Sequence, residues 1–454
     1  MTTATDSITT RAGEIAQQEG ERLLGRTTAS KRLYERALGS LPMGVGSSFQ
    51  VGDPYPLYLT EGKGSRVFDV DRNEYVDFHN GFGCMVVGHA HPKVAEAIAH
   101  AAHTGTHFAA PTEATVHLAE VLCDRYRVEQ VRFCNSGTEA TMHAIRVARA
   151  ATGREDIIKI EGSYHGHHDT VMFSVVPNSD VMGGREQPAS TPMSLGIPAD
   201  VGKHVHVVPF NDLGALERAL DEHGDKIACL ILEPVMMNIG IAQPQPGYLQ
   251  GMKDLLHKHG ALLVFDEVKS GATVAYGGAA DRYGVQPDLA CWAKATFGGT
   301  PGAAFGGARD VMAIVEKGAA QQGTFNGNPL VAAAALATLT EVLTPEAYEY
   351  LAKIGTRLAE GCARAMKENG IPGHAVDLGA KGCVSYRPEP LTNYRDFLEA
   401  NTDLYEASYP WMINRGVFMT PGDEEQWTLS VQHTDADIDR YVDAFADLCA
   451  ALAG

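Results

Sequence analysis

Lys294 stands in surroundings that are unusual for a charged side chain. The apolar run LACWA precedes it, and the glycine-containing stretch ATFGGTPGAAFGG follows it. Apolar surroundings disfavour the ammonium form, so this lysine is a candidate for a depressed pKa and for covalent bonding to a carbonyl carbon. The alternative is a surface lysine whose stem lies on apolar neighbours while its ammonium stays in water.

Asp266 and Glu267 follow a strongly apolar run at residues 262–265. In an open parallel sheet, the carboxyl ends of the strands form the edge at which ligands bind. A carboxylate at that edge needs a cation or strong hydrogen-bond donors, so Asp266 is a candidate ligand-binding acid. The sequence equally allows Asp266 to cap the following helix or to pair with an arginine.

A third segment, NSGTEA at residues 135–140, joins the apolar run VRFC to a helical pattern. Small polar residues at this position offer hydroxyls and free backbone N–H groups at the positive end of the helix dipole. Such a turn is an anion site well suited to a phosphate. Taken by itself, the segment favours ordinary helix capping by Ser136 or Thr138.

Together the three features match the requirements of pyridoxal phosphate. Its phosphate binds at a helix N-terminus, a carboxylate keeps its pyridine nitrogen protonated, and a lysine bonds covalently to its aldehyde carbon. The lysine here follows the acid by 28 residues.

The order of six motifs resembles the class III aminotransferases, which have the fold type I of pyridoxal phosphate enzymes. The resemblance covers nearly the whole chain and is strongest to the glutamate-1-semialdehyde aminomutase-like branch, with its amine and ω-amino acid transaminases. The motifs are NSGTEA at 135–140, GSYHG at 162–166, LEPV at 232–235, FDEV at 265–268, Lys294, and GTFNGNP at 323–329.

This resemblance implies a role for each matching residue. Lys294 would bind the cofactor and then transfer the proton, while Asp266 would pair with the pyridine nitrogen. The other implied cofactor contacts are Ser136, Gly137 and Thr138 at the phosphate, Tyr164 and Val268 on the two ring faces, and Asn238 at the 3′-oxygen. Thr324 would reach the phosphate bound by a neighbouring subunit, which implies a homodimer with its active site at the interface.

Two departures from the family pattern bear on the substrate. Gln50 stands where aminomutases have an arginine for the substrate carboxylate, and a neutral amide cannot form that charge-assisted clamp. In the loop after Lys294, Phe297 replaces a glycine and Gly302-Ala303 alters the residues after the proline. We expect the cofactor site to be retained and the pocket shape to change; natural divergence and engineering of residues 296–303 both fit.

The function predicted from these observations is transfer of an amino group from an amine or ω/β-amino acid to a keto acid such as pyruvate, in ping-pong order. The alternatives are an aminomutase, which moves the amino group within one molecule, and another activity on the same fold. The resemblance implies (S) stereopreference. Candidates for binding the acceptor's carboxylate are Arg387, Arg395 and Arg415.

Several partner classes are not expected. The histidines of HGHHD at 165–169 lack a completing acid or cysteine pattern, so no metal is predicted. The net charge of −19 argues against nucleic acid and anionic membranes as partners, and no apolar run approaches the length of a bilayer span.

The N-terminus lacks the apolar core of a secretory signal, and the eight cysteines lack metal-site spacing. We expect a cytoplasmic enzyme.

The elements that position these residues follow from short apolar runs alternating with helical patterns from about residue 92. Apolar runs in which polar residues do not alternate with apolar ones are typical of strands buried on both faces, so an α/β fold with a mostly parallel sheet is predicted. The family resemblance implies that this sheet is of the seven-stranded type. The runs lie at 131–134, 157–160, 205–208, 228–232, 262–265 and 289–292.

The flanking segments predict a second, smaller α+β domain. A helix is expected at 10–40, a hairpin-like segment at 56–78, long helices from 330 to 366, short strands at 382–386, 416–419 and 427–430, and a closing helix at 435–452. The predicted division is 1–75 and 331–454 for the small domain and 76–330 for the large, cofactor-binding domain.

Overall fold

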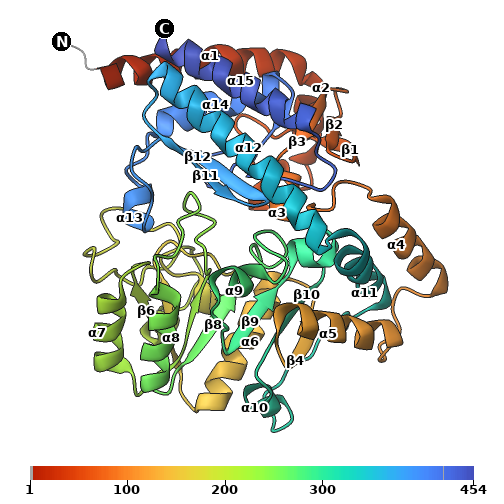
Figure 1. The fold of residues 1–454 in the computed structure, drawn as a ribbon, viewed down its shortest axis with the longest axis vertical. Helices are drawn as coiled ribbons and strands as arrows, with labels where there is room; N and C mark the ends of the chain where they lie inside the picture. The colour runs from red at the N-terminus through yellow and green to blue at the C-terminus, as the bar shows by residue number, and fades with distance from the viewer. Residues whose placement is uncertain (1–3, 423) are drawn as a thin grey trace.

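The computed structural model describes residues 4–422 and 424–454. Figure 1 shows a lower lobe built around one large sheet and an upper lobe in which both ends of the chain lie together. The family fold predicted from the sequence, a mostly parallel α/β sheet with a smaller α+β part, is confirmed.

The large sheet has seven strands in the order β4-β10-β9-β8-β7-β5-β6. The pairs from β9 to β6 are parallel, whereas β10 is antiparallel to both of its neighbours. The strands are β4 (Gln130–Cys134), β5 (Asp156–Ile160), β6 (Val205–Val208), β7 (Ile227–Leu232), β8 (Leu262–Asp266), β9 (Leu289–Trp292) and β10 (Ala303–Gly307).

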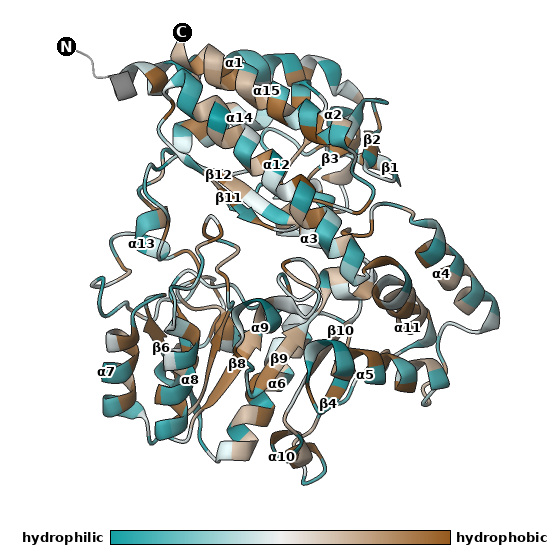
Figure 2. Ribbon diagram, viewed as in Figure 1, coloured by the Kyte–Doolittle hydropathy of each residue, from teal (hydrophilic) through white to brown (hydrophobic). Residues whose placement is uncertain are grey.

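Helices cover both faces of this sheet because its central strands are apolar on both sides. Figure 2 shows hydrophobic residues concentrated on the strands and polar residues on the outer sides of the helices. One face packs on α5 (Glu113–Tyr126), α7 (Leu213–His223) and α8 (Tyr248–Lys258). The other packs on α6 (Gly137–Thr152), which thereby holds its N-terminus at the carboxyl edge of the strands.

Strand β10 was not predicted. Its sequence, AAFGG, has little β propensity because alanine and glycine offer few side-chain contacts. The strand nevertheless lies between β4 and β9, and a Cβ on Gly306 would stand 2.3 Å from the Gln130 carbonyl oxygen. Close backbone approach therefore explains this glycine in a buried strand.

The hairpin-like segment at 56–78 forms β1 (Leu59–Lys63), β2 (Arg66–Asp69) and β3 (Glu74–Asp77), as predicted. From near the other end of the chain, β13 (Val417–Phe418) pairs with β3 in parallel. The helix expected at 10–40 is divided into α1 (Ala4–Arg26) and α2 (Thr28–Ala37). Domain boundaries at 75 and 330 stay a prediction.

A third sheet contains β11 (His374–Leu378), β12 (Lys381–Ser385) and β14 (Trp427–Thr428), of which β11 was not predicted. The closing helix is α15 (Asp435–Ala453). The remaining α-helices are α3 (Asn80–Gly83), α4 (Pro92–Thr104), α9 (Gly278–Tyr283), α10 (Arg309–Met312), α11 (Pro329–Leu336), α12 (Pro345–Asn369), α13 (Tyr394–Phe397) and α14 (Thr402–Asn414).

Among the described helices, none is by itself both long and apolar enough to cross a bilayer. One pair of segments, Pro329–Val342 and Pro345–Asn369, reaches that length and apolarity only jointly, and the two meet at 75°.

Candidate active site

A cavity of about 410 Å³ lies at the carboxyl edge of the large sheet, between the two lobes. Eight of the nine residues predicted from the sequence line it, from five separate segments of the chain. Thr324 does not line this cavity; it is exposed on a different groove. The eight are Ser136, Gly137, Thr138, Tyr164, Asn238, Asp266, Val268 and Lys294.

Lys294 begins a short 3₁₀ turn, Lys294–Phe297, directly after β9. Its φ of +49° is rare for a residue with a side chain and costs backbone energy, as is common at functional sites. Burial, followed by the nearby Lys269, lowers its pKa to about 8. A buried lysine that releases its proton near neutral pH is suited to act as a nucleophile and as a proton carrier.

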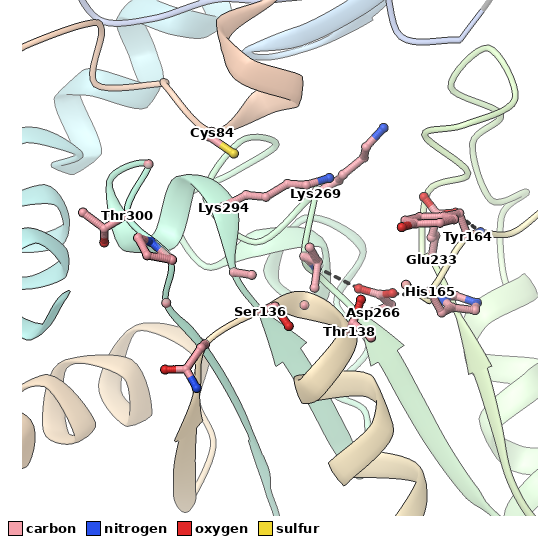
Figure 3. Close-up of a pocket in the computed structure, with 18 of the residues that line it drawn as sticks. Cys84, Ser136, Thr138, Tyr164, His165, Glu233, Asp266, Lys269, Lys294 and Thr300 are labelled. Carbon is pink, nitrogen blue, oxygen red and sulfur yellow. Dashed lines mark hydrogen bonds and ion pairs between the residues drawn. The ribbon is translucent and has the colours of Figure 1, made fainter. Parts of the chain in front are cut away.

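Asp266 ends β8 and is 5% exposed. One carboxylate oxygen lies 2.8 Å from His165 Nδ1, and the other accepts a hydrogen bond of 3.0 Å from the Val268 backbone N–H. Figure 3 shows these contacts on the cavity floor. The partners described for Asp266 thus include no arginine, and its side chain lines the cavity.

Ser136 is the N-cap of α6, and its Oγ accepts a hydrogen bond of 3.2 Å from the Glu139 backbone N–H. The capping interpretation is therefore confirmed, but capping does not exclude anion binding. The N–H groups of Gly137 and Thr138, in the first turn of this helix, have no intrahelical acceptor. They remain available to an anion in the cavity.

Glu233 connects two of the predicted residues on the opposite wall. Its carboxylate accepts hydrogen bonds from the Tyr164 backbone N–H at 2.9 Å and from Asn238 Nδ2 at 3.1 Å. Burial raises the pKa of Glu233, and burial followed by Asp266 raises the pKa of Tyr164 to about 12. Glu233 thus fixes the backbone of Tyr164, and the tyrosine side chain stays neutral and presents the flat face of its ring.

Aromatic side chains surround the outer side of Tyr164. The ring of Phe49 stands edge-on to Tyr164 with centroids 5.7 Å apart, and it also contacts Phe82 at 5.7 Å and His167 at 5.9 Å. The adjacent Gln50 is exposed and lines a neighbouring cavity of about 600 Å³. The N-terminal segment therefore packs aromatic rings behind Tyr164, and Phe49, Phe82 and Gln50 line the neighbouring cavity, not the one that holds Lys294.

Phe297, one of the departures in the loop after Lys294, is 1% exposed and packs in the core instead of lining the cavity. The shape of the site is set instead by Gly299, Thr300, Pro301 and Gly302, which do line it.

The three arginines considered for the substrate carboxylate are not available for it. Each is bound to a glutamate, and none lines the cavity. The pairs are Arg387 with Glu399 at 3.0 Å, Arg395 with Glu161 at 2.7 Å, and Arg415 with Glu19 at 3.2 Å.

Sequence reasoning missed Lys269, which lines the cavity beside Lys294, and the glutamate that holds it, Glu425. Lys269 follows Asp266 by three residues in FDEVK, so its place at the strand end was a usable signal. Glu425 lies in a loop far along the chain, and no local pattern points to it.

Comparison with known proteins agrees with this geometry. Residues 48–388 match the family described as aminotransferase class-III. The chain is 40% identical over 421 residues to glutamate-1-semialdehyde 2,1-aminomutase 2 of Brevibacillus brevis, covering 91% of this chain and 96% of that protein.

Two solved structures share the whole architecture. An omega-transaminase from Sphaerobacter thermophilus has a TM-score of 0.88 at 35% identity, covering 94% of this chain and 98% of its own. A transaminase with pyridoxal phosphate bound has a TM-score of 0.85 at 32% identity, covering 94% and 98%. With the family match, the motif order and a common fold in agreement, this chain belongs to the class III aminotransferases.

Proposed function

We propose that this enzyme is a pyridoxal phosphate-dependent transaminase. It moves an amino group from an amine or an ω/β-amino acid to a keto acid such as pyruvate by a ping-pong mechanism. The observation that best supports this proposal is the aromatic wall formed by Phe49, Phe82 and Tyr164 between the active-site cavity and its neighbour, with Gln50 where aminomutases have an arginine.

The cavity fits the cofactor at both of its ends. Free N–H groups of α6 and the hydroxyls of Ser136 and Thr138 suit a phosphate. Gly137 lets the backbone pass under Val268, because a Cβ there would stand 2.9 Å from Val268 Cγ1. A flat ring then fits between Val268 and Tyr164, which line the same cavity as Asp266.

When bound, pyridoxal phosphate supplies an electron-withdrawing ring that stabilises negative charge on the carbon bearing the amino group. Asp266 would support this by pairing with the protonated pyridine nitrogen, and His165 Nδ1, 2.8 Å from the carboxylate, fixes its orientation. Lys294 Nζ would hold the cofactor, and the same amine would take and return the substrate proton. Asn238, held by Glu233, would offer its amide to the cofactor's 3′-oxygen.

The aromatic wall favours substrates with an apolar group over substrates with a carboxylate on that side. A carboxylate buried without a cation pays a desolvation penalty of several kcal/mol. Because about 1.4 kcal/mol changes binding affinity tenfold, this penalty is enough to make the enzyme prefer amines over acids.

An aminomutase is the second candidate, because a relative with 40% identity bears that name. The two functions differ in their need for a second substrate. A mutase returns the amino group to the same molecule, whereas a transaminase requires a separate acceptor.

We expect the purified holoenzyme to convert 1-phenylethylamine to acetophenone only when pyruvate is present, with equal formation of alanine. Chromatography of ketone and alanine, with and without pyruvate, measures this directly. The same preparation is incubated with glutamate-1-semialdehyde in the absence of any keto acid. Efficient isomerisation there, without amine turnover, would contradict the proposal in favour of the aminomutase.

Gln50→Arg is expected to shift the preference toward acidic substrates, because a guanidinium returns the missing positive charge to this wall. The ratio of kcat/KM for glutamate-1-semialdehyde over that for 1-phenylethylamine should rise about tenfold or more. Gln50→Met, which adds no charge, is the matched control. An unchanged ratio in Gln50→Arg would mean that the identity of residue 50 does not select the substrate.

The proposed assembly is a homodimer in the cytoplasm. Thr324 is exposed outside its own chain's cavity, and the exposed rings of Phe108 and Phe325 lie on the same groove or beside it. A second copy packed there would bury these rings and bring Thr324 toward the partner's phosphate site. All eight cysteines are free thiols, which supports a reducing compartment.

A further inference from the structure

The keto acid that accepts the amino group carries a carboxylate, and a buried carboxylate needs a cation or several strong donors. The three arginines suggested by the sequence are bound to glutamates outside the cavity. In the part of the chain that the structure describes, the lysines and arginines lining the cavity are Lys294 and Lys269. Because Lys294 serves the cofactor in the proposed function, Lys269 is left as the cation for the acceptor.

The ammonium of Lys269 is held in place but retains bonding capacity. It donates to Asn238 Oδ1 at 2.7 Å and lies 2.9 Å from Glu425 Oε1. An ammonium has three N–H donors, so one remains beyond these two contacts. Figure 3 shows Lys269 and Lys294 on the side of the cavity opposite Ser136 and Thr138.

Glu425 is shared between Lys269 and a second buried lysine. Lys381 lies 3.1 Å from the other oxygen of Glu425 and donates to Thr428 Oγ1 at 2.8 Å. The side chains of Lys381 and Glu425 are 0% and 1% exposed, against 10% for Lys269. Two lysines therefore share one carboxylate. Burial lowers the pKa of Lys381, and Lys269 is the lysine of the two that lines the cavity.

The network is built to keep Lys269 charged. Burial favours its neutral form, but Glu425, with Glu424 and Glu233, outweighs burial and raises its pKa to about 12. Gly83 makes room for the second lysine, because a Cβ there would stand 2.2 Å from Lys381 Nζ. A fixed cation with a spare donor suits a site that receives a neutral amine and a keto acid in turn.

We propose that Lys269 binds the carboxylate of the keto-acid acceptor, using the N–H that Asn238 and Glu425 leave free. The inference rests on the proposed transaminase function. When a neutral amine occupies the site, Lys269 keeps its bonds to Glu425 and Asn238. When a keto acid enters, its carboxylate gains a charge-assisted hydrogen bond without any of these bonds breaking.

The test compares an acceptor that has a carboxylate with one that lacks it. In Lys269→Met, we expect kcat/KM for pyruvate to fall by at least about tenfold, or about 1.4 kcal/mol. The value for propanal, at the same saturating amine, should change by less than about twofold, since propanal makes no carboxylate contact. Lys269→Arg should restore most of the pyruvate value because it retains a cation.

Lys381→Met is the matched control, since it removes the other lysine on Glu425 without touching the cavity lining. It should not lower pyruvate use selectively. An equal loss on pyruvate and propanal in Lys269→Met would overturn the inference, because it would mean that Lys269 only supports Asn238. A wild-type enzyme that transfers no amino group from any amine to pyruvate would instead overturn the proposed function, and this inference with it.

A measurement on the unmodified enzyme keeps the inference open to refutation even if Lys269→Met does not fold. Propanoate and propanamide have the same shape, and only propanoate carries a charge. Propanoate should compete with pyruvate at concentrations about tenfold lower than propanamide. Equal inhibition by the two would contradict a cation at the acceptor site.

Discussion

Lys294→Ala is expected to lose essentially all transaminase activity, at least about 10⁴-fold, while remaining folded. The residue supplies both the covalent attachment and the proton carrier, and alanine can replace neither function. Its burial and the low pKa of about 8 indicate an amine prepared for this chemistry rather than a surface charge. Turnover of amine with pyruvate, together with the visible absorbance of the bound cofactor, measures the loss.

The variant should fold well, because removal of a buried ammonium at a φ of +49° takes away a desolvation cost. A normal melting temperature and circular dichroism spectrum would therefore accompany the loss of activity. Lys381→Met, which replaces a buried lysine outside the cavity lining, is the control for general disturbance of the site. Substantial transamination by Lys294→Ala would remove the basis for assigning this cavity as the active site.

Asp266→Asn is expected to bind cofactor but to lose about a hundredfold or more in kcat. A neutral amide cannot keep the pyridine nitrogen protonated, so the ring would withdraw electrons less strongly. The amide retains the size of the carboxylate and can still bond to His165 and to the Val268 N–H. We therefore expect little change in melting temperature, measured beside turnover on the same preparation.

The adjacent acid provides a matched control. Glu267 is as buried as Asp266, but its carboxylate accepts bonds from the Ala279 and Ala280 N–H groups, both at 2.8 Å, and from Ser270 Oγ. Glu267→Gln should lower stability by about 1–3 kcal/mol and leave kcat nearly unchanged. The reverse result, with Asp266→Asn merely less stable and fully active, would make Asp266 a structural residue.

The sequence by itself determined the parallel sheet and most of the cavity. Several strands of the large sheet are short apolar runs with a cavity-lining residue or turn at the carboxyl end, as at Asp266 and Ser136. Because parallel strands place those ends at one edge, local patterns predicted that Lys294, Asp266 and the turn at Ser136 lie together. Tyr164, Val268 and Asn238 were predicted from the family resemblance, and they line the same cavity. Strand β10 was missed because alanine and glycine carry no periodic signal, and only the close approach of neighbouring backbones accounts for it.

Only the tertiary structure decided which charged residues are available for chemistry. Arg395 was a candidate from the sequence and Lys269 was not, yet Arg395 is held by Glu161 outside the cavity and Lys269 lines it. Glu425 forms ion pairs with Lys269 and Lys381, and the three residues come from segments that lie far apart in the sequence. The reason is physical: apolar burial in a strand leaves a local pattern, whereas the partner of a buried charge is set by which segments the folded chain brings within about 4 Å.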